Sequence, residues 1–419
     1  MPKNYSKKFS RRLFIKSGIF GLSTPLLSGS FNSKLNNFKV PISYSDKDWA
    51  SIRSHFIIDE DVTYMNNASL GMPPLSVVES INHGYKLISK EPLHGKHELQ
   101  DNISKLVIPK IAETFGVDND EIVLTRNASE ALDIQAHSVK LKRGDEVIIS
   151  SQEHPAGVRP WLVRQKNDGI KIKTVFIPSP LKSVSDTVSR LSNAITSKTK
   201  VISFCHVTRG GHLYPVKEIV DMAKERSLLT LVDGAQAAGQ FPINLSKIRC
   251  DAYSVSLHKW ILAPAGTGFL FINKEARERI ISPFIYKKDP ILSGFNPPGT
   301  KDFPVRAAIG IALDYINNIG LLKIEKRCRT LSNYLKEGLN QIDGVKILSS
   351  SINKLSAPGS TIFEKEGLDA FESVPMMENL INTHIDEHVR DGHNAIRVST
   401  HIYNTKQQID KFLEALSKI

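Results

Sequence analysis

A lysine and a histidine stand side by side where a predicted strand ends, in the segment SVSLHKWILAPAGTGFLFI at 254–272. Burial disfavours the charged form of a lysine and lowers its pKa. A lysine that is neutral near physiological pH is an amine nucleophile that can form an imine with a carbonyl compound. Lys259 is therefore the first candidate for a reactive side chain.

Other polar residues also follow predicted strands. They are residues 127–129 after EIVLT, His154 after DEVIIS, His206 after VISFC, Asp233 after LLTLV and Lys259 after DAYSVS. Ligands of open α/β sheets bind outside the carboxyl ends of the strands. The shared position of these residues predicts one functional site at that edge.

The elements that must position these residues form an alternating pattern between 66 and 273. Helical patterns alternate with seven short runs rich in β-branched residues, which are EIVLT, GDEVIIS, KIKTVFI, KVISFCHV, LLTLVD, DAYSVS and GTGFLFI. Such alternation is typical of βα units. It predicts an α/β fold with a mainly parallel seven-stranded sheet that has helices on both faces.

The chain divides into four predicted segments. Residues 1–40 form a leader, 41–65 contain a helix near 44–55 that packs with a small domain, and 66–285 form the large domain. A Pro/Gly-rich loop follows residue 284, and then come a helical stretch over 305–339, a strand at VKILSS and the ending AIRVSTHIYNTKQQIDKFLEALSKI. This change of pattern predicts a small α+β domain over 286–419.

The net charge of +12 is concentrated in the leader. Residues 1–40 hold eight Lys and Arg and no acid, whereas the remainder carries 47 basic and 43 acidic residues. That balance gives no reason to infer a nucleic-acid partner. The three cysteines, Cys205, Cys250 and Cys328, form no CxxC pair and are expected to be small core residues.

The central motifs resemble a known family. The run LVDGAQAAGQ, with Lys259 in SLHKW 26 positions after Asp233, resembles the class V aminotransferases, which are pyridoxal-phosphate enzymes of fold type I. The resemblance extends from about residue 64 to the C-terminus. It implies pyridoxal 5'-phosphate as cofactor and a homodimer with shared active sites.

The resemblance implies a role for four residues around the cofactor ring. Lys259 forms the imine with the cofactor aldehyde and later moves protons at the substrate carbon. Asp233 pairs with the pyridinium nitrogen, and Gln236 hydrogen-bonds the ring oxygen. His154, in QEHPAG, stacks on the face of the ring. Lys259, Asp233 and His154 are thus the predicted catalytic residues.

The cofactor phosphate requires hydrogen-bond donors. The segment TRNASEALD is interpreted as a strand end, a tight turn and a helix start, which directs the free backbone N–H groups of Ala128 and Ser129 and the Ser129 hydroxyl at an anion. The resemblance adds Ser256 and His258 as phosphate contacts. It also implies that Thr300, in PPGT, reaches the phosphate of the neighbouring subunit.

Substrate recognition is expected from three residues. The resemblance implies that Arg397, in AIRVSTHIYNT, binds a substrate carboxylate and that Asn67, in YMNNASLG, approaches the substrate. Arg209 stands where desulfurase-like members have Asn, and its charge is hypothesised to favour an additional anionic group. Residues 376–396 contain no cysteine, which disfavours a desulfurase that forms a persulfide there.

The histidines leave alternatives open. His206 is as compatible with a hydrogen-bonded interior residue as with a cofactor contact. His384, His388 and His393 have a spacing that could hold a metal, but no thiolate or carboxylate set accompanies them. We favour solvated loop histidines and expect no metal.

The predicted function is a pyridoxal-phosphate enzyme acting on an amino acid or a peptidic amine, with transamination as the default reaction. Epimerisation, C–S bond cleavage or decarboxylation would use the same residues. The segments GTKDFP and RVSTHIYNT resemble the isopenicillin N epimerase-like branch. The alternative outside the enzymes is a binding protein that kept the fold but lost catalysis. The intact Lys259, Asp233 and Gln236 argue against this alternative.

The leader contains SRRLFIKSGIFGLSTPLLSGS, which resembles a twin-arginine export signal. This resemblance predicts a periplasmic or otherwise exported protein that uses the twin-arginine machinery. Without an A-x-A cleavage site the segment could remain as a membrane tether. The alternative is a basic N-terminus of a cytoplasmic protein.

Replacing Arg11 and Arg12 with lysine tests the export prediction. We expect both substitutions together to abolish accumulation in the periplasm, because the signal is recognised through the paired arginines. Cell fractionation followed by immunoblotting measures the distribution. Replacing Lys7 and Lys8 with arginine is the control, and unchanged accumulation of the Arg11/Arg12 variant would contradict the prediction.

Overall fold

The structure is a computed structural model that describes residues 44–284, 292–296 and 298–419. Residues 43–419 form one compact unit. The twin-arginine prediction concerns residues 1–40 and lies outside the described residues. The boundaries at 41–65, 66–285 and 286–419 stay predictions.

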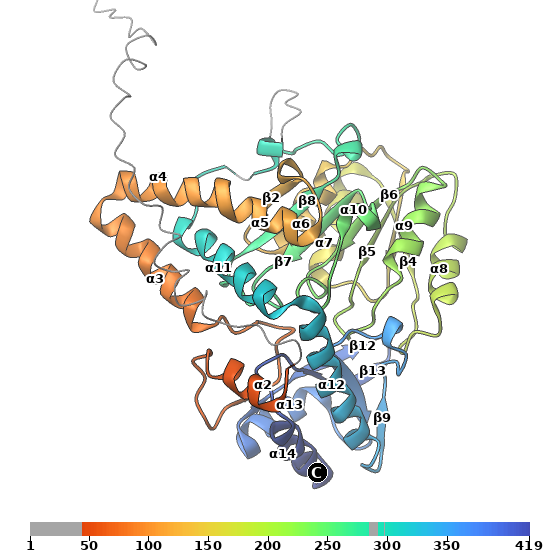
Figure 1. The fold of residues 1–419 in the computed structure, drawn as a ribbon. Helices are drawn as coiled ribbons and strands as arrows, with labels where there is room; N and C mark the ends of the chain where they lie inside the picture. The colour runs from red at the N-terminus through yellow and green to blue at the C-terminus, as the bar shows by residue number, and fades with distance from the viewer. Residues whose placement is uncertain (1–43, 285–291, 297) are drawn as a thin grey trace, which may run out of the picture. The chain divides into compact units, whose positions relative to one another are not determined.

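The larger sheet has seven strands in the order β2-β8-β7-β6-β5-β3-β4 (Figure 1). Only β8 runs antiparallel to its neighbours β2 and β7, and the other pairs are parallel. All seven predicted strands and the mainly parallel α/β sheet are confirmed. The strands are β2 (Ile122–Thr125), β3 (Glu146–Ser150), β4 (Lys171–Val175), β5 (Thr199–Cys205), β6 (Leu229–Asp233), β7 (Ala252–Ser256) and β8 (Gly268–Ile272).

Both faces of this sheet are covered, because successive side chains of a strand point to opposite faces. On β8, Leu270 packs in a cluster with Trp161 of α7, whereas the neighbouring Phe269 contacts Phe115 of α5 with ring centroids 5.0 Å apart. Every residue of β3, β6, β7 and β8 is accordingly buried. The helices of this part are α3 (Leu75–Lys90), α4 (Pro92–Asn102), α5 (Ile108–Phe115), α6 (Ala128–Ser138), α7 (Pro155–Asp168), α8 (Val184–Asn193), α9 (Val216–Lys224) and α10 (Leu245–Ile248).

The predicted helical stretch over 305–339 is divided in two. Helices α11 (Phe303–Ile319) and α12 (Leu321–Leu339) meet at Gly320, where the backbone has a φ of 93° and the axes bend by 74°. Glycine adopts that φ without the strain that a side chain would cause. Helix α11 packs along α3, and α12 packs along the C-terminal helix.

The second sheet is antiparallel, with four strands in the order β12-β13-β10-β9. Side chains of its two longest strands pack in one hydrophobic core with side chains of α12 and of the C-terminal helix. The predicted strand at VKILSS corresponds to β9. The elements are β9 (Val345–Ile347), β10 (Ser360–Lys365), α13 (Ala370–Ile381), β12 (Asp386–Arg390), β13 (His393–Ser399) and α14 (Lys406–Ser417).

The N-terminal segment of the described chain lies against these elements. Helix α2 (Asp46–Arg53) begins with a capping box between Ser45 and Asp48, and it confirms the predicted helix near 44–55. The Arg53 guanidinium donates to the Tyr403 carbonyl at 2.7 Å, whereas Arg327 of α12 stacks over Trp49. Strand β1 (Thr63–Tyr64) pairs in parallel with β11 (Thr383–His384). The chain thus enters the large sheet from a fixed point beside β13.

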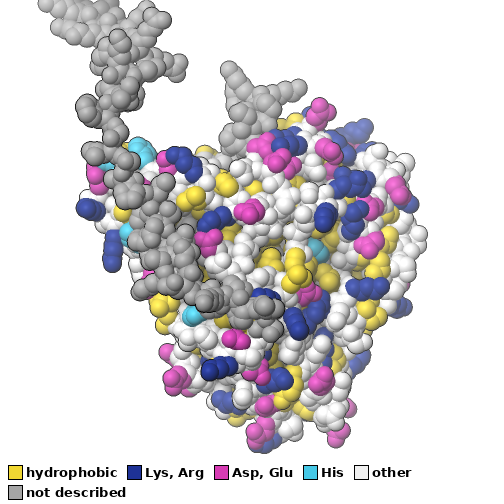
Figure 2. Space-filling view, viewed as in Figure 1, with side chains coloured by type: hydrophobic (Ala, Val, Ile, Leu, Met, Phe, Trp, Pro, Cys, Tyr) yellow, Lys and Arg dark blue, Asp and Glu magenta, His cyan; other side chains and the backbone are white. Residues whose placement is uncertain are grey.

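On the face drawn in Figure 2, Lys and Arg side chains are interspersed with Asp and Glu rather than gathered into one patch. Within the described residues no single helix is long and apolar enough to cross a membrane; α11 and α12 meet the length and composition test only as a bent pair.

Candidate active site

A cavity lies at the carboxyl ends of β5, β6 and β7, with about 420 Å³ of empty space that includes open solvent. Seven of the eleven predicted site residues line it, whereas Asn67, His258, Thr300 and Arg397 do not. The lining residues are Ala128, Ser129, Leu132, His154, Ala156, Cys205, Val207, Arg209, Asp233, Ala235, Gln236, Ser256 and Lys259.

Lys259 presents an amine to this cavity. Burial lowers the pKa of the Lys259 amine to about 8; the negative charge of Asp233 opposes that shift, and the positive charges of Arg397 and Arg209 add to it. Among the described residues, none accepts a hydrogen bond from the amine. A substantial neutral fraction therefore exists near neutral pH, as nucleophilic chemistry requires.

The backbone that carries Lys259 is held from one side by the segment around Gly71. The Gly71 N–H donates to the carbonyl of His258 at 2.8 Å. A Cβ atom at Gly71 would lie only 1.8 Å from the carbonyl oxygen of Lys259. The close approach of the two backbones requires glycine here, and it fixes the position from which the lysine side chain extends.

Asp233 ends β6 and places a carboxylate in the same cavity. One oxygen, Oδ1, accepts from the Ala235 N–H at 2.8 Å. Burial raises the pKa of Asp233, while that backbone hydrogen bond and the charge of Lys259 lower it. No described side chain donates to the carboxylate, so its second oxygen is available to a ligand N–H.

Gln236 has a defined amide orientation. Its Oε1 accepts from the indole N–H of Trp260 at 2.8 Å, and its Nε2 donates to the Ala68 carbonyl at 2.8 Å. An indole N–H can only donate, so the carbonyl side of the amide must face Trp260. One N–H of the Gln236 amide consequently remains for a ligand.

The start of α6 matches the predicted anion site with one correction. Asn127 caps the helix by accepting from the Glu130 N–H at 2.9 Å. The Ala128 N–H is not free as predicted, because it donates to the Ser256 hydroxyl at 2.9 Å. Among the described residues, neither the Ser129 N–H nor its hydroxyl has a hydrogen-bond partner. The N-terminus of α6 therefore still offers donors to an anion.

His154 is the N-cap of α7 and lies at the rim of the cavity. Its Nδ1 accepts from the Ala156 N–H at 3.1 Å. Burial lowers the pKa of His154 to about 4, and the positive charge of Lys259 contributes to that shift. The imidazole is consequently neutral at physiological pH, with its proton on Nε2.

His258 and Thr300 lie outside the cavity lining. His258 Nδ1 donates to the Thr267 carbonyl at 3.2 Å, and burial lowers the pKa of the ring. In the neutral ring Nε2 is then an acceptor, so donation to a phosphate needs a second proton. Thr300 is exposed on the described surface. Its contact with a neighbouring subunit stays a prediction.

Asn67 has both ends of its amide engaged. It accepts from the Tyr403 hydroxyl at 2.7 Å and donates to the Lys259 carbonyl at 3.5 Å. The structure thus gives Asn67 a place behind the reactive lysine rather than in the cavity. The residue that contacts Arg397 is the preceding Asn66, with 3.1 Å between Oδ1 and the guanidinium. Repeated asparagines in YMNNASLG hid this distinction from sequence reasoning.

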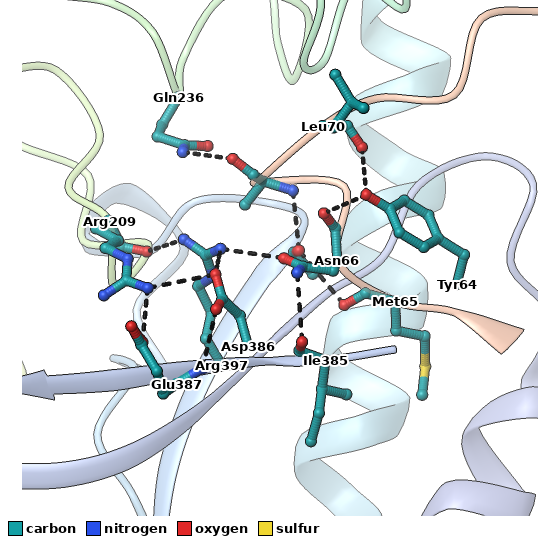
Figure 3. A network of polar contacts seen from close by, with 12 residues as sticks. Tyr64, Met65, Asn66, Leu70, Arg209, Gln236, Ile385, Asp386, Glu387 and Arg397 are labelled. Atoms are coloured by element: carbon teal, nitrogen blue, oxygen red, sulfur yellow. Dashed lines mark hydrogen bonds and ion pairs between the residues drawn. The ribbon is translucent and has the colours of Figure 1, made fainter. Parts of the chain in front are cut away.

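Arg397 is nearly completely buried and belongs to a network of acids and arginines (Figure 3). Its guanidinium contacts Asp386 and donates to the Arg209 carbonyl at 3.4 Å. Burial lowers the pKa of Arg397 to about 10, although Asp386 opposes that shift. Arg209 in turn donates to Glu387 at 2.6 Å. The charge of Arg209 is therefore balanced by an acid that the sequence hypothesis did not include.

Two further titratable groups were missed by sequence reasoning. Cys205 lines the cavity, and burial raises the pKa of its thiol well above the usual value. Glu153 lies behind it; its Oε1 accepts from the Ser150 hydroxyl at 2.5 Å and from the Cys205 N–H at 3.2 Å. Burial raises the pKa of Glu153 to about 7. Both residues stand at strand ends, which was the available signal.

The remaining histidines lie in the interior or in strands, so the expectation of solvated loop histidines at 384, 388 and 393 is wrong. His206 Nδ1 lies 2.8 Å from the Tyr253 hydroxyl, which corresponds to the interior alternative. His393 lies 3.1 Å from Glu364, whereas His388 is buried in β12 and His384 stands in β11. In the part of the chain that the structure describes, no three His, Cys, Asp or Glu side chains are placed to hold a metal ion.

A family model supports the resemblance. The model described as aminotransferase class-V matches residues 63–412. Two similar curated proteins are a probable cysteine desulfurase of Synechocystis and the isopenicillin N epimerase of Amycolatopsis lactamdurans. Each is 27% identical over 88% of this chain, covering 94% and 98% of the respective relative.

Solved structures show the same fold. A C-DES mutant with glycine covalently linked to its PLP cofactor superimposes with a TM-score of 0.80, at 23% identity over 88% of this chain and 99% of that one. A cysteine desulfurase from Thermococcus onnurineus gives a TM-score of 0.78, at 23% identity over 88% of this chain and 97% of that one. The predicted fold type I architecture is confirmed.

The burial of Lys259 predicts an unusual titration. In cofactor-free protein we expect acetylation of Lys259 to rise with pH through a midpoint near 8, because only the neutral amine reacts. Asp233→Asn should move the midpoint lower, since the carboxylate stabilises the ammonium form. Peptide mass spectrometry measures the rate.

The control for this titration is the denatured protein, in which the midpoint should return to about 10.4, the value of an unperturbed lysine. A folded-state midpoint equal to the denatured one, or an upward shift in the Asp233→Asn variant, would contradict the electrostatic account.

Proposed function

Since the chain belongs to the aminotransferase class-V family, we propose that it is a pyridoxal-phosphate enzyme that breaks a bond at the carbon next to a substrate amine. The substrate is an amino acid or a peptidic amine. The observation that carries the proposal is the convergence of Lys259, Asp233, Gln236 and the α6 N-terminus on one cavity.

The donor set fits this cofactor. The Ser129 N–H and hydroxyl, which have no hydrogen-bond partner in the described part of the chain, suit a phosphate at a helix N-terminus. A buried carboxylate, Asp233, suits a protonated ring nitrogen, and the remaining Gln236 N–H suits a ring oxygen. A neutral histidine at the rim suits stacking on an aromatic ring. Each polar part of pyridoxal phosphate thus has a chemically matched group.

Pyridoxal phosphate, when bound, supplies an electron sink for the bond that is broken. Lys259 carries a proton to or from the substrate carbon, because its lowered pKa lets the amine exist in both forms near neutral pH. Asp233 holds the proton on the ring nitrogen. Trp260 keeps the carbonyl side of the Gln236 amide toward its indole, which leaves one amide N–H that would hydrogen-bond the ring oxygen of the cofactor.

The first reaction that we propose is transamination. Epimerisation is the second candidate, because relatives at 27% and 24% identity are named isopenicillin N epimerase. The persulfide route of a cysteine desulfurase is disfavoured although other relatives carry that name, since 376–396 contain no cysteine and Cys205 is held as a thiol.

We also propose that residues 1–40 export the folded enzyme by the twin-arginine route. The support is their paired arginines and their lack of acids.

The two reactions differ in the fate of the cofactor and of the substrate hydrogen. In deuterium oxide, transamination predicts loss of the visible absorption of the loaded protein together with a carbonyl product. Epimerisation predicts that the visible absorption is retained and that deuterium replaces the hydrogen on the carbon next to the amine of the recovered substrate. Absorption spectroscopy and mass spectrometry of the product separate the two.

Lys259→Ala, with folding verified by circular dichroism, should show neither formation of the carbonyl product nor deuterium exchange at the substrate carbon. If loaded wild-type protein gave neither absorption loss nor deuterium exchange with a panel of D- and L-amino acids and their amides, the proposed function would be wrong.

A further inference from the structure

The ion pair at Arg397 is built by the register of one β-hairpin. Strands β12 and β13 are joined by Asp391 and Gly392, whose φ angles are 51° and 83°. Two positive φ values are typical of the tight two-residue turn, which fixes strand register. This register places Asp386 directly opposite Arg397. Opposite residues of antiparallel strands are close enough for their side chains to pair.

The Arg397 guanidinium is already engaged on most of its donor positions. One terminal nitrogen contacts both Asp386 and Asn66, and the other donates to the Arg209 carbonyl. Among the described residues, the buried Nε has no partner, and of the two N–H groups of the nitrogen that contacts Arg209 only one is used. A carboxylate binds best to two parallel N–H groups of a guanidinium. Arg397 offers no such open pair while Asp386 is in place.

The surrounding charges are balanced. Arg209 donates to Glu387 at 2.6 Å and lies 3.4 Å from Asp386. Two guanidinium groups thus face two carboxylates, and the four charges sum to zero. A further carboxylate entering beside Arg397 would meet the like charge of Asp386, whereas a neutral carboxamide would not. The network in Figure 3 therefore favours a neutral carboxamide over a carboxylate beside Arg397.

Resting on the proposed function, we propose that Asp386 determines specificity by occupying Arg397 in place of a substrate carboxylate, so that the site selects amines whose neighbouring carboxyl group is blocked as an amide. The N-terminal residue of a peptide is such a substrate. Arg209, which lines the cavity and whose carbonyl accepts from Arg397, is likewise bound by an acid, Glu387. The opposing possibility, that a substrate carboxylate displaces Asp386, is an outcome of the test.

The test compares L-alanine with L-alaninamide, which share an amine and a side chain and differ in the charge of the carboxyl group. Dissociation constants come from the visible spectral change of the PLP-loaded full chain. Asp386→Asn should shift the preference toward L-alanine by about tenfold or more, because the neutral amide no longer repels a carboxylate and holds the Arg397 guanidinium less strongly. Taking the ratio between variants cancels the different basicity of the two amines.

The matched control is Glu364→Gln, which removes an acid of similar exposure from β10 of the same sheet. It should leave the ratio within about twofold, since Glu364 contacts His393 and Lys346 rather than Arg397. Thermal unfolding midpoints verify that each variant is folded. An equal shift in the control, or an unchanged ratio in Asp386→Asn, would overturn the proposal.

Wild-type protein supplies a measurement that needs no variant. Corrected for amine basicity, L-alaninamide should bind more tightly than L-alanine. Tighter binding of L-alanine would overturn the role of Asp386 and support displacement by substrate. A wild-type preparation without a visible band would instead refute the proposed function, so the two failures are distinguishable.

Discussion

The desolvation of one lysine amine is the constraint on which the rest of the site depends. An ammonium group is costly to bury, and the chain offers Lys259 no hydrogen-bond acceptor among the described residues. Asp233 partly offsets that cost from the neighbouring strand end, because its negative charge favours the ammonium form of Lys259 and the charge of Lys259 favours the carboxylate. A parallel sheet makes this possible, because its strands deliver both residues to one edge from well-separated parts of the sequence.

Backbone contacts turn this electrostatic arrangement into a fixed geometry. Gly71 lets the loop after β1 approach the Lys259 carbonyl, and Asn67 donates to the same oxygen. Trp260, the next residue along the chain, orients Gln236. Gly71 and Asn67 thus fix the position of the Lys259 backbone, whereas Trp260 fixes the orientation of the Gln236 side chain. The hairpin of β12 and β13 adds two acids that pair with Arg209 and Arg397.

Much of the fold and part of the site could be predicted from the sequence. The seven strands were identified because each is a short run of β-branched and aromatic residues bounded by turn residues. Lys259, Asp233 and Ser129 were identified because strand ends meet at one edge, whereas Gln236 was identified through the resemblance to the class V aminotransferases. The division of the helix at Gly320 was missed, since an isolated glycine in a helical pattern is usually tolerated.

Contacts between distant segments could not be predicted from local patterns. The bond from Ala128 to Ser256 joins residues that are 128 positions apart, and it depends on how β2 and β7 flank β8. The contact of Arg397 with Asp386 was accessible in principle, because counting outward from the Asp-Gly turn places the two residues opposite each other. That count needed both strands to be recognised, and β12 carries more charged than apolar residues.

Borohydride reduction of the loaded protein, followed by peptide mapping, tests the role of Lys259 most directly. We expect the cofactor to become permanently attached to the peptide containing Lys259, and we expect Lys259→Ala to lose the attachment while it keeps its fold. Attachment to another lysine, or no attachment in the wild-type protein, would contradict this role.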